Sequence, residues 1–286
     1  LRQDRLSGGF LRTEPKLPLR VLSAVLFVPL LVFLAFVGGI WFAALVTVEV
    51  VLGLREFYRM MMIRGMRPSP RLGILLGLAL CGLSFAGTSS GTNLLFTAGL
   101  LIVFCAELLR SEGERGMEPM AVTLFDVLYV GWLSVHLVFL RELPRHLNQP
   151  YAEGARYVLL AFFLTWVCDT AAYGFGLWLG KNRLFEAVSP KKSVEGSIGG
   201  LLATMAAAHV ARLWFAPFLD PVHATVLGVA VGVFAQVGDL AESLFKREAG
   251  VKDSSALIPG HGGVLDRLDS LYFVLPVSAV LYPLFG

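Results

Sequence analysis

Carboxylates and cations at helical spacing lie near the C-terminal end of the chain. Asp239, Glu242 and Lys246 follow one another at intervals of three and four residues, which places them on one face of a helix. Asp266 and Asp269, three residues apart, begin the next apolar segment. Carboxylates from two helices with lysines nearby are what a divalent cation and a polyphosphate require, and such hard oxygen ligands suit Mg²⁺. No multi-Cys or multi-His set accompanies them, which disfavours zinc.

The segment between these two helices predicts an irregular turn. Pro259, Gly260, Gly262 and Gly263 surround His261, and this composition is incompatible with a continuous helix. His261 is able to orient a phosphate or assist proton movement, or simply to stabilise the turn, and the sequence leaves these roles open. Four cations flank the turn: Lys246, Arg247, Lys252 and Arg267.

A second polar loop, residues 189–200, precedes the seventh apolar segment. Ser193 is placed to cap the following helix, so free backbone N–H groups would converge with Lys191 and Lys192 on an anion. The alternative is a basic loop that touches acidic lipid headgroups. The loop lacks the pattern of a P-loop, so a Walker-type nucleotide site is not indicated.

Asp169 lies in the middle of the sixth apolar segment, where a charge is costly and has to face protein or water. Ala172, Gly176 and Gly180 share its helical face and would allow a neighbouring helix to approach closely. Asp169 is thus either functional or a helix-packing residue. Glu242 and Lys246 have a similar alternative, an ion pair at the membrane surface, but that reading leaves Asp239 unexplained.

The composition predicts an integral membrane protein with all-α architecture. The 286 residues are 56% hydrophobic and only 16% charged, with a mean hydropathy of +0.71, whereas about a quarter of the residues are charged in soluble domains. The basic residues form no long tract, which argues against nucleic-acid binding. The three cysteines, Cys81, Cys105 and Cys168, fit neither a zinc site nor a disulfide framework and are expected to be buried.

Apolar runs near the length of about 20 residues needed to cross a bilayer predict nine membrane-spanning helices, or eight if the short third one is discounted. Most of the 24 Lys and Arg residues then lie on the side of the N-terminus. The positive-inside rule therefore places the N-terminus and both polar loops in the cytoplasm, and the C-terminus on the opposite side. The predicted helices are 21–38, 40–62, 71–87, 92–109, 120–140, 156–179, 196–216, 222–245 and 268–285.

The polar residues divide this single membrane domain into three parts. Residues 1–20 are a charged tail without the apolar stretch of a cleavable signal peptide. Residues 21–155 contain few ionisable groups and are expected to be scaffold helices. Residues 156–286, where carboxylates, lysines and glycines accumulate, are expected to be the catalytic part.

The motif S-x-F-K-R-x4-K-D-x-S-x2-I-P-G-H-G-G-x2-D-R-x-D, from Ser243 to Asp269, resembles the signature of the phosphatidate cytidylyltransferase family, also called CDP-diacylglycerol synthases. The resemblance extends to Asp169, to the loop of residues 189–196 and to Asp239, and covers about the last 120 residues. It implies a Mg²⁺-dependent enzyme of the cytoplasmic (inner) membrane that condenses CTP with phosphatidic acid to CDP-diacylglycerol and pyrophosphate.

The resemblance also implies site residues. Asp239 and Asp266 are expected to hold the metal, with support from Asp169, and a second cation is compatible with this set. Small-residue helix faces make a homodimer reasonable. The alternatives are a related CTP-dependent lipid enzyme, such as a polyprenol kinase or an ether-lipid CDP synthase, and more remotely an ion-coupled transporter. The expected catalytic residues are Asp239, Asp266, Lys246, Arg267 and His261, and the expected substrate-binding residues are Ser189, Lys191, Lys192, Ser193, Glu195, Arg247, Lys252, Asp253 and Asp269.

Overall fold

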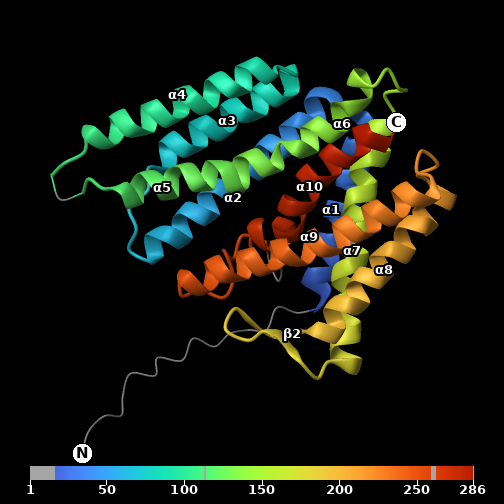
Figure 1. Ribbon diagram of the computed structural model, residues 1–286. Coiled ribbons are helices and arrows are strands. Elements are labelled where there is room, and N and C mark those ends of the chain that lie inside the picture. The colour runs from blue at the N-terminus through green and yellow to red at the C-terminus, as the bar shows by residue number, and fades with distance from the viewer. Residues whose placement is uncertain (1–16, 113, 259–261, 286) are drawn as a thin grey trace, which may run out of the picture.

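The computed structural model describes residues 17–112, 114–258 and 262–285, so His261 lies outside the described residues. The chain is a bundle of long helices with one small hairpin (Figure 1). Every apolar run expected to span the membrane corresponds to a helix or to a broken pair of helices. The helices are α1 (Leu17–Val37), α2 (Gly39–Ile63), α3 (Pro70–Ala86), α4 (Ser89–Leu108), α5 (Met117–Asp126), the π-helix η1 (Val127–Trp132), α6 (His136–His146), α7 (Glu153–Leu179), α8 (Val194–Trp214), α9 (Pro221–Glu248) and α10 (Leu265–Phe285).

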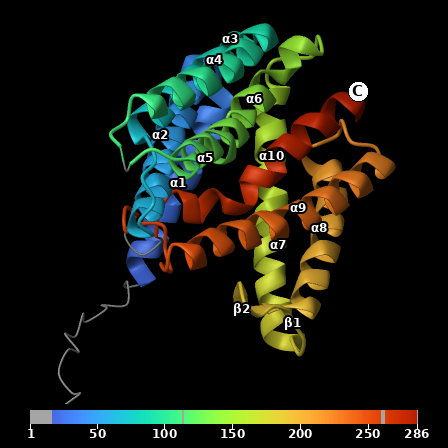
Figure 2. The same ribbon diagram turned by 60° about the vertical axis from the view of Figure 1, so that its left-hand side comes forward.

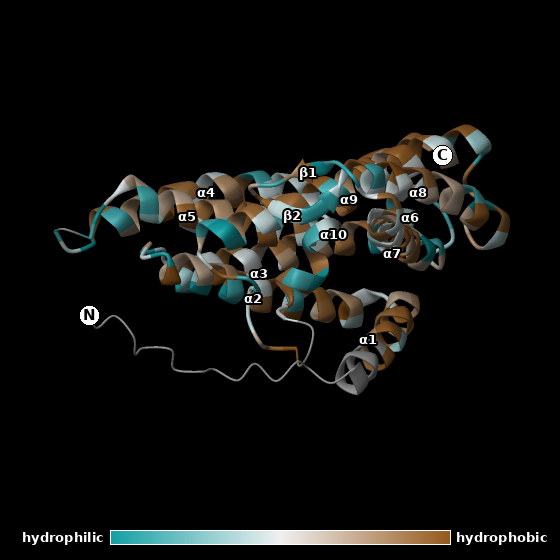
Figure 3. Ribbon diagram, turned by 90° about the horizontal axis from the view of Figure 1, so that it is seen from below, coloured by the Kyte–Doolittle hydropathy of each residue, from teal (hydrophilic) through white to brown (hydrophobic). Residues whose placement is uncertain are grey.

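The membrane class is confirmed, whereas the number of spans and their orientation stay predictions. In the described chain five helices are long and apolar enough to cross a membrane, namely α4, α7, α8, α9 and α10, and a sixth span results if the bent pair α5–η1 and α6 counts as one. α3 and the described part of α1 are shorter, and α2 carries four charged residues. Figure 3 shows apolar residues along most helices and polar residues in the hairpin and at helix ends.

The fifth predicted helix, 120–140, is not continuous. It consists of α5, η1 and α6, with a bend of 45° between Trp132 and His136. A π-helical turn widens the backbone and disrupts the regular hydrogen-bond ladder, which accounts for the break. The apolar pattern continues through the bend, so periodicity alone does not reveal it.

The loop that follows α7 contains two short strands, which the all-helical prediction did not include. β1 (Arg183–Phe185) pairs antiparallel with β2 (Ser189–Ser193), with Arg183 opposite Ser193 and Phe185 opposite Ser189. Ser193 ends the hairpin and begins α8, because its Oγ accepts a hydrogen bond of 3.1 Å from Gly196 N. The predicted helix cap at Ser193 is confirmed.

Small residues allow α7, α8 and α9 to pack closely, as Figure 2 illustrates from a second direction. A Cβ atom added at Gly200 of α8 would lie 2.9 Å from Ala172 Cβ and 3.1 Å from Cys168 O, both in α7. On α9, a Cβ at Gly228 would lie 2.7 Å from Met205 Cα of α8. The predicted small-residue face of α7 is therefore the face that α8 covers.

The cysteines differ in their surroundings. Cys81 and Cys168 are buried as predicted, but Cys105 is exposed, so the expectation for this residue is wrong. Cys105 lies on α4, which packs mainly against α3 and α5 at the edge of the bundle (Figure 1). An edge helix of a membrane protein turns apolar residues outward toward lipid, so an apolar sequence context does not distinguish lipid contact from burial in protein.

Candidate active site

The polar face of α9 forms as predicted, but its partners come from other elements. Lys246 Nζ lies 2.7 Å from Glu242 Oε2 on the same helix and 2.8 Å from Asp266 Oδ1 on α10. Glu242 is completely buried. The interpretation of Glu242 and Lys246 as a pair at the membrane surface is therefore wrong, because this lysine joins two carboxylates inside the protein.

Asp266 is held by four hydrogen bonds at the beginning of α10. Its Oδ1 accepts from Lys246 Nζ, and its Oδ2 accepts from Ser254 N at 2.9 Å, Ser254 Oγ at 2.8 Å and Gly263 N at 2.8 Å. Gly262 can lie close to this carboxylate because glycine has no side chain. A Cβ atom at Gly262, whose φ is +81°, would lie 2.5 Å from Asp266 Oδ2. The glycine turn predicted from the sequence thus brings the backbone N–H of Gly263 to Asp266.

Asp239 faces the hairpin. Its Oδ2 lies 2.6 Å from Lys192 Nζ of β2, and both side chains are partly exposed. One cation of the 189–196 loop therefore reaches the acidic face of α9. Lys191, which precedes Lys192 in β2, is exposed.

Asp169 approaches the same region from α7. Ser270 Oγ of α10 donates a hydrogen bond of 3.4 Å to Asp169 Oδ1, and the negative charges of Asp269 and Asp239 act on Asp169. Asp269 in turn interacts with Asp239 and Glu242. We call Asp169, Asp239, Glu242 and Asp269 the carboxylate cluster; they come from α7, α9 and α10 and face the two cations Lys192 and Lys246.

The carboxylate cluster has the chemistry of a cation site, although its present arrangement is not that of a coordinated metal. Within the described residues no group of three or more His, Cys, Asp or Glu side chains is close enough to hold a metal ion. Two properties nevertheless fit a divalent cation: the four carboxylates outnumber the two ammonium groups that face them, and the buried Glu242 Oε1 has no hydrogen-bond partner among the residues that the structure describes. Oxygen donors of this kind suit Mg²⁺. The assignment of a metal to Asp239, Asp266 and Asp169 stays a prediction.

The remaining residues predicted to bind substrate differ in burial and in their contacts. Ser193 is buried and its hydroxyl caps α8, whereas Glu195 turns back to the start of the hairpin, where its carboxylate accepts a hydrogen bond of 2.7 Å from Asn182 Nδ2. Arg247 Nε donates to Val188 O of the hairpin at 3.3 Å. Ser189 is half-buried in β2, and three further residues project from the surface of the described chain: Lys252, Asp253 and Arg267.

Glu56 of α2 is a buried carboxylate that the sequence reasoning did not single out, although it contacts the signature segment. Ser255 Oγ donates to Glu56 Oε1 at 2.6 Å, and Leu265 N donates to Glu56 Oε2 at 2.9 Å. The signal that identifies it is Glu49, seven residues earlier, because two acidic residues on one face of an apolar helix are costly unless protein covers them.

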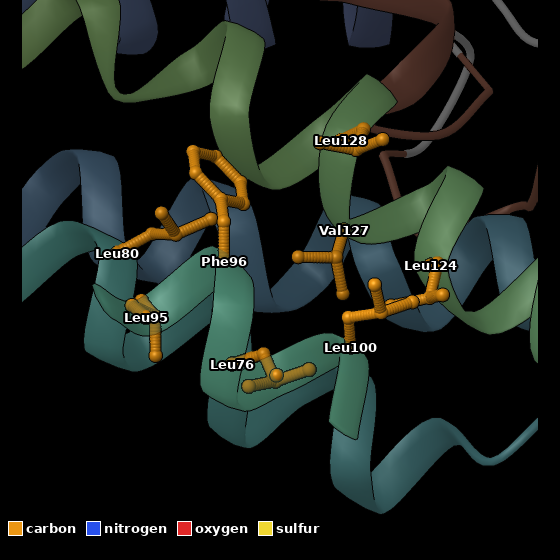
Figure 4. Close-up of a pocket in the computed structure, with 9 residues that line it drawn as sticks. Leu76, Leu80, Leu95, Phe96, Leu100, Leu124, Val127 and Leu128 are labelled. Carbon is orange, nitrogen blue, oxygen red and sulfur yellow. The ribbon is translucent and has the colours of Figure 1, made fainter. Parts of the chain in front are cut away.

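Two cavities lie away from the carboxylate cluster. The first, about 310 Å³, is lined only by apolar side chains and glycine from α3, α4, α5 and η1, and Figure 4 shows Leu76, Phe96 and Val127 around it. The second, about 520 Å³, lies between α4, η1, α6 and the end of α10 and includes His136 and His146. Neither cavity contains a carboxylate, so neither has the charges that a polyphosphate reaction requires.

Comparisons with known proteins show the family to which the chain belongs. The profile of the cytidylyltransferase family matches residues 18–285. A phosphatidate cytidylyltransferase from Synechocystis sp. is 35% identical over 280 residues, which are 90% of this chain and 94% of the relative. Phosphatidate cytidylyltransferases from Staphylococcus aureus and Staphylococcus epidermidis are 42% identical over 173 residues and 37% identical over 171 residues, in each case 60% of this chain and 62% of the relative. The chain therefore belongs to the cytidylyltransferase family of nucleotidyl-transferring enzymes.

Proposed function

We propose that this enzyme transfers the cytidylyl group of CTP to phosphatidic acid in the cytoplasmic membrane, with its active site facing the cytoplasm. The observation that carries this proposal is the lysine bridge from Lys246 to Glu242 and Asp266, which joins α9 and α10 beside the carboxylate cluster. It lies within the segment that resembles the family signature. The names of the relatives support phosphatidate as the acceptor.

In the proposed reaction a phosphate oxygen of phosphatidate attacks the α-phosphorus of CTP. A new P–O bond forms, the bond from the α-phosphorus to the oxygen that bridges it to the β-phosphorus breaks, and pyrophosphate leaves with that electron pair. The nucleophile is already anionic near neutral pH, so the reaction needs no strong general base. The main barrier is the repulsion between two highly charged phosphates, and fixed positive charges lower it.

Asp239, Asp266 and Asp169 would hold Mg²⁺, which supplies positive charge beside the α-phosphate. The residues of the chain then have separate tasks. Lys246 keeps Asp266 and Glu242 in place across the helix interface. Lys192, which is partly exposed and opposite Asp239, is available to exchange its carboxylate partner for a phosphate when CTP binds. Lys191, Arg247, Lys252 and Arg267 add positive charge around the entrance from water.

The test is transfer of label by the purified protein in detergent with phosphatidate. CTP labelled at the α-phosphate should label a lipid product in the presence of Mg²⁺ and not in its absence, whereas CTP labelled at the γ-phosphate should label only pyrophosphate. Asp239→Asn and Asp266→Asn should abolish transfer, and Glu248→Gln, an exposed carboxylate on the same helix α9, should retain it. Label from the γ-phosphate in a lipid would instead identify a kinase and contradict the proposal.

A further inference from the structure

Glu56 belongs to the N-terminal half of the chain, in the last third of α2, and only 5% of its surface is exposed. In Figure 1 the end of α2 lies beside the end of α9 and the segment that follows it. A carboxylate buried at such a position requires partners, because burial of an unpaired charge is costly. The partners of Glu56 identify what this residue does.

Three hydrogen-bond donors converge on Glu56, and they belong to Ser254, Ser255 and Leu265. The hydroxyl of Ser255 donates to Oε1 at 2.6 Å. The backbone N–H of Leu265 donates to Oε2 at 2.9 Å, and the hydroxyl of Ser254 lies 3.2 Å from the same oxygen. Leu265 is the first residue of α10, whose N–H has no acceptor within the helix. Glu56 thus caps α10 from another helix.

Glu56 is also connected to Asp266 through Ser254. The Ser254 hydroxyl lies 2.8 Å from Asp266 Oδ2 and 3.2 Å from Glu56 Oε2, and a hydroxyl has a single proton to donate. The two carboxylates therefore share this donor. Gly263 fills the space between them, because a Cβ atom there would overlap both Ser254 Oγ and the Glu56 carboxylate.

We propose that Glu56 is a positioning residue of the active site: it anchors Ser254, Ser255 and Leu265 and, through Ser254 and the first turn of α10, fixes the position of Asp266. This inference rests on the proposed function, in which Asp266 acts at the phosphates of CTP. Displacement of a reacting group by about 1 Å costs on the order of 100-fold in rate, so loss of this anchor should act mainly on the chemical step.

Glu49 provides a matched control. It lies on the same helix two turns earlier, and its Oε1 accepts from Tyr272 Oη at 2.9 Å and from Ser134 Oγ at 3.2 Å. It has two donors where Glu56 has three, and although Tyr272 belongs to α10, neither donor is Ser254, Ser255 or Leu265. A change at Glu49 disturbs α2 without removing the anchor.

The experiment compares Glu56→Gln with Glu49→Gln in purified protein. Glutamine has nearly the size of glutamate, but one carboxylate oxygen becomes an NH₂ group, so the side chain is neutral and cannot accept from both the Ser255 hydroxyl and Leu265 N–H. Glu56→Gln should lower kcat by about 100-fold with little change in KM for phosphatidate, and Glu49→Gln should stay within about threefold of the wild type. A double-mutant cycle of Glu56→Gln with Ser254→Ala should be non-additive, which a general loss of stability would not produce.

A second measurement does not depend on the reaction. Lys252 is exposed two residues before Ser254, so the rate of tryptic cleavage after it reports local opening at the anchored residues. Glu56→Gln should raise this rate about tenfold or more, and Glu49→Gln should not. Unchanged cleavage in Glu56→Gln overturns the anchor, and faster cleavage with unchanged kcat overturns the positioning role. Failure of the wild-type protein to label lipid from CTP overturns the proposed function instead.

Discussion

Lys246 of α9 and Asp266 of α10 form an ion pair of 2.8 Å across the helix interface, and the same ammonium group lies 2.7 Å from the buried Glu242. The side chain of Lys246 is 15% exposed and that of Glu242 is 1% exposed. One cation thus satisfies two carboxylates in a region with little water. Its removal leaves two negative charges without their principal partner.

The first prediction concerns Lys246. Lys246→Met should abolish activity and destabilise the protein by about 3 to 5 kcal/mol, the usual cost of removing one partner of a buried ion pair. In the double variant Lys246→Met with Glu242→Gln, the buried negative charge of Glu242 is gone, so much of the stability should return while activity stays lost. Thermal unfolding in detergent measures the first effect and label transfer the second. Full activity of either variant would contradict the role of Lys246.

The second prediction concerns Lys192 and Asp239, whose side chains are 24% and 33% exposed. A partly exposed ion pair contributes only about 0 to 1 kcal/mol, so Lys192→Ala should leave the unfolding temperature nearly unchanged. Because Lys192 is proposed to bind a phosphate of CTP, the variant should raise KM for CTP and lower kcat. Lys181→Ala, an exposed lysine just before the same hairpin, is the control and should behave like the wild type. Equal kinetics for the two variants would exclude a contact of Lys192 with substrate.

The third prediction concerns the glycine turn. Gly263→Ala should inactivate the enzyme, because the added methyl group overlaps Ser254 Oγ and the Glu56 carboxylate. Gly250→Ala is the control: Gly250 has a φ of +70° but no atom lies within 4 Å of its Cβ position. It should therefore cost only the backbone strain, about 1 to 2 kcal/mol, and retain activity. Measurement of kcat at matched amounts of folded protein separates the two variants.

The fourth prediction concerns the contact of α7 with α8. Gly200→Ala should destabilise the protein, since its methyl group would lie 2.9 Å from Ala172 Cβ and force the helices apart. Gly174→Ala, on α7 with no atom within 4 Å of its Cβ position, should instead stabilise by about 0.5 to 1 kcal/mol through helix propensity. The two glycine-to-alanine changes thus shift the unfolding temperature in opposite directions. A rise for both would show that the helices are not in close contact.

The sequence predicts the local features of this site well. Asp239, Glu242 and Lys246 share a face because helical periodicity fixes it, and Ser193 caps α8 because a serine before a helix satisfies its free N–H groups. Long apolar runs predict helices equally well, although not the number that crosses a membrane. These features depend on residues within one or two helical turns of one another, and spacing along the chain describes them completely.

The partners of these residues could not be predicted in the same way. Lys192 pairs with Asp239 and Glu56 accepts hydrogen bonds from Ser254 and Ser255 only because distant elements meet in space. The strands β1 and β2 and the bend between η1 and α6 also escaped prediction, because a short polar hairpin has little apolar alternation and the apolar pattern runs through the bend. Tertiary packing supplies this information.

The contact between Glu56 and Ser254 has a consequence for the synthesis of the protein, because 198 residues separate its two ends. α2 is synthesised early, when neither Ser254 nor Leu265 has been translated, so the Glu56 carboxylate has none of these donors until α10 arrives. Insertion of α10 then supplies the hydrogen-bond donors of Glu56 and at the same time places Asp266. A nascent chain that ends before α10 therefore has no assembled site, and the enzyme becomes active only after α10 has been inserted.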